Sequence, residues 1–96
     1  MDKTKQIEIL RQAINELYTN SYLCVILVKL LYPEEVYIKE SVHMYPAMIR
    51  KYIPLFTREN SNAFSSAKQG LCWWEAYDKS NREKFLLWII NELEKE

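Results

Sequence analysis

The sequence predicts a single all-α domain of four to five helices spanning residues 1–96. Apolar residues make up 49% of the 96 positions, and in several segments they recur at the spacing of a helix face. Glycine occurs once and proline three times, which leaves little turn chemistry for an all-β chain. Low glycine together with abundant Leu, Ile, Glu and Lys indicates helices. A chain of this length forms one domain.

The first periodic segment runs from Lys5 to Tyr18, and either Asp2 or Thr4 would cap its start. Ile9 falls outside the apolar stripe of this segment, so we expect it to be exposed or to lie at the edge of a self-association surface. The stripe consists of Ile7, Leu10, Ile14, Leu17 and Tyr18.

Residues Tyr22 to Tyr32 are apolar nearly all round, which predicts a central helix buried on most sides. The first and last helices are expected to pack around it. A strand is the alternative, because Val25, Ile26 and Val28 are β-branched. Pro33 ends the segment. Residues 36–44 fit either a short helix or a strand.

A further helical face follows Pro46 and comprises Met48, Ile49, Tyr52, Ile53 and Phe56. Pro54 should stop or kink this helix, because it cannot donate to the Arg50 carbonyl. Residues 57–70 are polar and contain the one glycine, so we expect a mobile loop there, pinned to the body by Phe64.

The last helix has a capping-box signature in Ser80–Glu83. Its apolar face would be formed by Phe85, Leu86, Ile89, Ile90 and Leu93, with Trp88 at one margin.

Composition lowers the expectation for several classes of function. Thirteen acidic and thirteen basic residues cancel, whereas proteins that bind nucleic acid by neutralising phosphates are usually basic. Cys24 and Cys72 lie in apolar contexts and should be buried thiols, with a disulfide as the alternative. No secretory signal is apparent, and the longest apolar run is too short to span a bilayer. We therefore expect a cytoplasmic protein without a membrane partner.

No motif points to catalysis or to a cofactor. His43 is the single histidine, and Glu40 three residues earlier is too little to predict a metal site. One glycine cannot build a phosphate-binding loop. The sequence shows no coupled acid, base and nucleophile, so we expect no enzyme, no cofactor and no metal.

The candidate contact residues lie towards the C-terminus, where Trp73 and Trp74 are adjacent and Tyr77 and Arg82 follow. Trp and Arg are enriched in binding hot spots. At least one of the two tryptophans should be buried, and the other would contact a partner. Arg82 falls within the apolar arc of the last helix, where it either pairs with Asp78, stacks on a tryptophan or anchors a partner. A frayed first turn with a solvated Arg82 is the remaining alternative.

A basic grouping offers a different class of function. Arg50 and Lys51, with Arg58 and Lys68 further along the chain, form the one basic grouping with aromatic residues nearby, namely Tyr45 and Tyr52. A solvated surface is the simpler interpretation, and weak nucleic-acid binding is the alternative. An aromatic and arginine pocket for a small anionic, nucleotide-like ligand is a further alternative.

Four stretches in this order, Leu23-Cys24, Tyr52–Phe56, Trp73-Trp74 and Arg82–Ile90, resemble short uncharacterised proteins of tailed bacteriophages and prophages. Those proteins end in a Trp-rich segment followed by an Arg-x-x-Phe-Leu helix. The resemblance carries no functional residue over. It implies a phage accessory protein that acts by binding, for example by modulating a host protein in the host cytoplasm, and we expect it to form a homo-oligomer.

Overall fold

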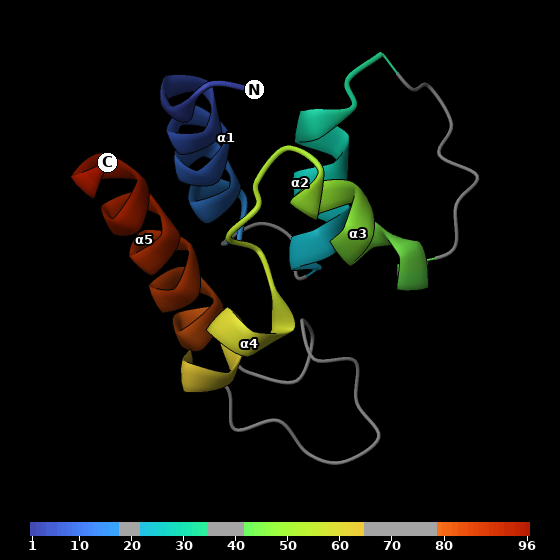
Figure 1. Ribbon diagram of the computed structural model, residues 1–96. Helices are drawn as coiled ribbons and strands as arrows, with labels where there is room; N and C mark the ends of the chain where they lie inside the picture. Colours follow the sequence, from blue (N-terminus) through green and yellow to red (C-terminus); the bar gives the residue numbers. More distant parts are fainter. Residues whose placement is uncertain (18–21, 35–41, 65–78) are drawn as a thin grey trace.

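A computed structural model of the chain describes residues 1–17, 22–34, 42–64 and 79–96. These residues form five α-helices and two short 3₁₀ helices, and no strand occurs among them, which confirms the predicted all-α class (Figure 1). The radius of gyration of 12.6 Å is close to the roughly 13 Å expected for a folded domain of this size. The elements are α1 (Lys3–Glu16), α2 (Leu23–Leu31), η1 (Val42–Met44), α3 (Tyr45–Arg50), α4 (Arg58–Ser61), η2 (Asn62–Phe64) and α5 (Lys79–Lys95).

Helices α1 and α5 lie side by side and run in opposite directions, so that both termini are at the same end of the molecule (Figure 1). Polar contacts join them at that end. The Lys3 ammonium donates to the backbone carbonyl of Glu96, and Arg11 pairs with Glu94 at 3.3 Å. Both contacts are exposed, so packing of the apolar faces beneath them contributes more to stability than they do.

Helices α1 and α2 lie in the middle of the arrangement, since α1 packs on α5 and on α2, and α2 packs in turn on α3. The expectation that the first and last helices both pack on α2 is confirmed for α1 and wrong for α5, which packs on α1. The reason lies in the width of the buried face of α1, which is wide enough to contact two neighbours. That face consists of Gln6, Ile9, Leu10, Ala13 and Leu17.

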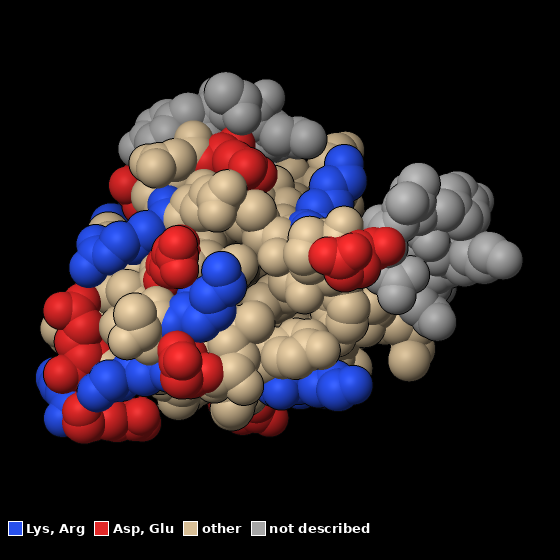
Figure 2. All heavy atoms as spheres, turned by 90° about the horizontal axis from the view of Figure 1, so that it is seen from above, with Lys and Arg blue, Asp and Glu red and all other residues tan. Residues whose placement is uncertain are grey.

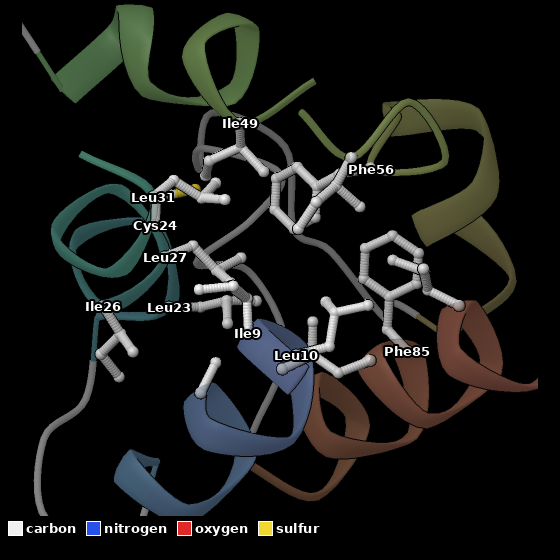
Figure 3. Close-up of a cluster of buried hydrophobic side chains, with 14 of the residues drawn as sticks. Ile9, Leu10, Leu23, Cys24, Ile26, Leu27, Leu31, Ile49, Phe56 and Phe85 are labelled. Carbon is white, nitrogen blue, oxygen red and sulfur yellow. The ribbon is translucent and has the colours of Figure 1, made fainter. Parts of the chain in front are cut away.

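Ile9 is 5% exposed, so the prediction that it is exposed or edges a self-association surface was wrong. Figure 3 shows Ile9 beside Leu23 and Leu27 of α2, while Leu10 lies towards Phe85 of α5. Ile7, expected on the apolar face, is half-buried. The buried face of α1 is therefore rotated about the helix axis relative to the predicted stripe. The spacing of apolar residues does not show how many neighbours a helix has.

The start of α1 is capped as predicted, since the Asp2 carboxylate accepts a hydrogen bond from the Lys5 backbone N–H at 2.8 Å. The helix predicted for the next segment is confirmed as α2, and the alternative of a strand is wrong. Six of the nine residues of α2 are buried. Its N-cap is Tyr22, which makes no side-chain cap bond. Cys24 is a buried thiol, as expected.

Helix α3 ends at Arg50, and the chain continues in turns to Pro54 and beyond. Ile49, Ile53 and Phe56 are fully buried, so these predicted residues do enter the core. The prediction of one helical face up to Phe56 was wrong, because the helix ends before Pro54 and Ile53 and Phe56 lie in the turns that follow. Of the stretch left open between helix and strand, residues 42–44 form the 3₁₀ helix η1, and 36–41 lie outside the described residues.

Residues 58–64 of the predicted loop are helical, as α4 and η2. The loop prediction was therefore wrong for this part, because local side-chain caps hold it in turns that spacing of apolar residues does not reveal. Residues 65–70 and Cys72 lie outside the described residues.

The predicted apolar face of α5 is confirmed, because Phe85, Leu86, Ile89, Ile90 and Leu93 are all buried. The predicted cap is displaced. The helix already includes Lys79, so Ser80 belongs to its first turn.

Candidate functional site

Four aromatic side chains form a cluster that connects two segments of the chain to α5. Phe56 comes from the turns after α3, Phe64 from η2, and Phe85 and Trp88 from α5. The ring of Phe85 lies 5.6 Å from that of Phe56, 5.7 Å from that of Phe64 and 6.4 Å from that of Trp88. Phe64 in turn lies 6.0 Å from Trp88. These separations are within the range in which aromatic pairs attract each other. The cluster contains all three phenylalanines of the chain.

The cluster is buried at one side and partly open at the other. Phe56 and Phe85 are fully buried, and Figure 3 shows their rings next to each other. Phe64 and Trp88 are half-buried and pack against the core. Trp88 therefore lies at the margin of the apolar face of α5, as predicted, and presents part of its indole to the surface.

Phe64 is positioned by a series of short-range hydrogen bonds in the segment before it. The Thr57 hydroxyl caps α4 by accepting from the Asn60 N–H at 3.1 Å. The Asn60 amide nitrogen donates to the Leu55 carbonyl at 2.9 Å, and the buried Ser61 hydroxyl donates to the Arg58 carbonyl at 2.9 Å. These bonds fix the turns that bring Phe64 onto α5, which confirms that Phe64 holds this segment to the body.

Arg82, Phe85 and Trp88 follow one another at a spacing of three residues and form a diagonal row along α5. Arg82 is half-buried, and its position in line with Phe85 agrees with the apolar arc predicted from the sequence. Trp73, Trp74, Tyr77 and Asp78 lie outside the described residues. Of the predicted contact residues, the structure therefore describes Arg82 alone, which precedes Phe85 and Trp88 on α5.

The predicted basic grouping is divided between two elements. Arg50 and Lys51 are exposed at the end of α3, and Arg58 is exposed at the start of α4. Lys68 lies outside the described residues. The Lys51 ammonium lies 5.9 Å from the centre of the Tyr52 ring, a distance at which a cation and an aromatic face attract each other.

Tyr52 and Tyr32 form a second aromatic contact behind Lys51. Their rings meet edge-on at 5.3 Å, and the Tyr32 hydroxyl donates to the Met48 carbonyl at 3.0 Å. Burial, and secondarily the neighbouring Tyr52, raises the pKa of the Tyr32 hydroxyl above its usual value of 10.0. The neutral, hydrogen-bonded phenol is thus the favoured form, which suits a structural role that joins α2 to α3.

Charged side chains on the surface are mixed in sign. On the face shown in Figure 2, Lys and Arg are interspersed with Asp and Glu among the described residues. Ion pairs on this surface are exposed and short-range, such as Lys95–Glu92 at 3.1 Å and Lys5–Glu8 at 3.7 Å. Pairs of this kind contribute roughly 0–1 kcal/mol each.

Two kinds of feature are absent from the described ranges. No group of three or more His, Cys, Asp or Glu side chains is placed there to hold a metal ion. In the same ranges, no helix has the length and hydrophobicity needed to cross a bilayer.

Sequence reasoning missed the aromatic cluster as a unit. Phe85 and Trp88 are three residues apart on one helix, which does predict neighbouring rings. The spacing of residues does not predict that Phe56 and Phe64 lie next to these rings. Their contact with α5 depends on turns that side-chain hydrogen bonds hold in place.

No protein-family model, curated protein or solved structure matches this chain.

Proposed function

We propose that this chain is a small non-enzymatic binding protein that acts by direct contact with a protein partner. The observation that supports this proposal is the partly exposed edge of the aromatic cluster, where Trp88 is held by Phe64 and Phe85 on the same helix as Arg82. Trp and Arg are the residue types that most often dominate the energy of protein interfaces.

The support is geometric as well as compositional. Trp88 stacks on Phe85 with an interplanar angle of 19°, and Phe85 is itself fixed in the core. An indole held in this way loses little conformational freedom on binding, so more of its contact energy contributes to affinity. Trp73, Trp74 and Tyr77, which the sequence places shortly before α5, are proposed to extend the same contact surface.

The resemblance to short phage proteins suggests the biological setting. We propose a phage accessory protein that modulates a host protein in the host cytoplasm. In that setting a small compact domain acts by occupying a surface of its target.

The test is an affinity capture from lysate of the source organism's host, followed by measurement of affinity with the recovered partner. We expect Trp88→Ala and Arg82→Ala each to weaken that affinity by more than tenfold, the magnitude of a hot-spot substitution of about 1.4 kcal/mol or more. Tyr22→Ala is the matched control, because Tyr22 is an aromatic residue of 57% exposure at the N-cap of α2, away from α5 in sequence. Circular dichroism must show that each variant is folded.

The result that would contradict the proposal is a partner whose affinity is the same for wild type, Trp88→Ala and Arg82→Ala. A thermal-shift screen with nucleotides tests the alternative of a pocket for a small anionic ligand, which predicts a raised melting temperature. Salt-dependent retention on single-stranded DNA, lost in Arg50→Glu and Lys51→Glu, would favour the nucleic-acid alternative.

A further inference from the structure

The outer face of α5 carries a row of five exposed residues at alternating spacings of four and three. This is the spacing with which one helix contacts another in a coiled coil. The row faces away from the buried arc of α5, and Figure 1 shows α5 forming one edge of the molecule. The residues are Ser80, Lys84, Leu87, Asn91 and Glu94.

The centre of the row is apolar and its flanks have opposite charge. Leu87 is 46% exposed, one of the large apolar side chains that the fold leaves open to solvent. Lys84 lies on its N-terminal side and Glu94 on its C-terminal side. Lys84 has no ion-pair partner among the described residues, and Glu94 is engaged at one exposed oxygen by Arg11 at 3.3 Å.

This order of charges opposes the helix dipole. A helix is stabilised by acidic side chains in its first turn and basic ones in its last. The first turn of α5 contains no acidic residue, and its last turn contains Lys95, while Glu92, Glu94 and Glu96 also lie near its end. The helix dipole therefore does not account for the position of Glu94, which faces Arg11 of α1 on one side and is free to meet a cation of another surface on the other.

We propose that this row is a self-docking surface, on which the α5 helices of two copies of the chain pair in antiparallel orientation about a two-fold axis. A second copy presents the same row in reverse order. Residues whose numbers are symmetric about the axis then face each other, so that Lys84 meets Glu94 of the other copy and Leu87 meets Asn91. Because the interface is isologous, each contact occurs twice.

The same geometry fixes the expected strength. One helix pair buries less than the roughly 1,200 Å² of a stable interface, and the row contains one large apolar residue per copy. The association is therefore weak, reversible and sensitive to salt, since the charged pairs are close to solvent. This surface is next to the one that carries Trp88 but separate from it, so this inference does not rest on the proposed partner site.

The experiment is sedimentation equilibrium of the full chain over a rising concentration series, at low and at high salt. Wild type is expected to dimerise at the upper concentrations and less so in high salt. Lys84→Glu and Glu94→Lys should each weaken the association by roughly tenfold or more, because each places like charges opposite each other twice.

The decisive sample is an equimolar mixture of the two variants. Lys84→Glu carries two acidic residues in the row and Glu94→Lys carries two basic ones, so the mixture should associate where neither variant alone does. Lys29→Glu makes the same charge change on the exposed surface of α2 and should dimerise like wild type. All substituted residues are exposed, and unchanged circular dichroism will verify the fold.

Three outcomes would overturn the proposal. These are a wild type that stays monomeric throughout the series, a mixture that associates no better than its components, and a Lys29→Glu variant that is weakened as much as Lys84→Glu.

Discussion

Replacing Ile9 by alanine is expected to destabilise the protein by about 2–5 kcal/mol. Ile9 is 5% exposed and belongs to the central cluster of buried side chains (Figure 3). The substitution removes three buried carbon atoms and leaves a cavity between α1 and α2 that neither helix can close without losing contact elsewhere. A domain of this size has about 5–15 kcal/mol of stability, so the loss is a large fraction of the total.

Ile7 provides the matched control, because it is the same residue type on the same helix but is half-buried. Ile7→Ala should cost about 1 kcal/mol, since part of the side chain is already in water and solvent can occupy the space it leaves. The two substitutions have the same effect on helix propensity, so the difference between them reports burial alone.

Urea denaturation followed by circular dichroism measures both losses. With a slope of about 1–3 kcal/mol per M urea, a loss of 3 kcal/mol lowers the unfolding midpoint by roughly 1–3 M. Equal losses for the two variants, or a larger loss for Ile7→Ala, would mean that α1 presents a different face to α2, and would refute the burial of Ile9 between the two helices.

Three further predictions concern other contacts in the described structure. In a double-mutant cycle, Phe85→Leu and Trp88→Leu should show a coupling of about 0.5–1.5 kcal/mol in unfolding free energy, and simple additivity would argue against their stacking. Gln6→Leu should raise the melting temperature, because one buried Gln6 oxygen has no hydrogen-bond partner among the described residues. An unpaired buried polar atom costs about 1–3 kcal/mol. A lowered melting temperature would indicate that this oxygen does have a partner. Tyr32→Phe should cost about 0.5–1.5 kcal/mol near neutral pH by removing the hydrogen bond to Met48. Because the Tyr32 pKa is raised on folding, the stabilisation by the neutral hydroxyl is complete below pH 10 and is lost as the pH rises above that value. In Tyr32→Phe the decline in stability at alkaline pH should therefore be smaller than in wild type. An identical decline would contradict the raised pKa of Tyr32.

Much of the fold could be predicted from the sequence because the apolar residues of a long helix with one buried face recur at helical spacing. The buried residues of α5 and of the chain around Ile53 were assigned correctly, since each segment contacts the core on one side. The rotation of α1 was assigned wrongly, since a helix between two neighbours buries a wider arc than its most apolar stripe. Residues 58–64 were assigned as loop because α4 and η2 are too short for periodicity to register.

The candidate site could be predicted in part. Trp88 at the margin of α5 and Arg82 within its apolar arc follow from helical geometry alone. Phe64 was expected to hold its segment to the body, but its position between Phe85 and Trp88 depends on the caps at Thr57 and Asn60. Such caps act through individual hydrogen bonds rather than through a repeated pattern.

The sequence by itself determined the class of secondary structure, the approximate positions of the long helices and most of the residues that enter the core. These properties depend on neighbours within a few positions along the chain, where spacing, proline and capping residues act directly. The tertiary structure decided that α1 packs between α2 and α5, that Ile9 is buried and that Trp88 is fixed against Phe64 and Phe85. Those outcomes depend on which helices meet, and contacts between residues distant in sequence leave no local pattern from which they can be inferred.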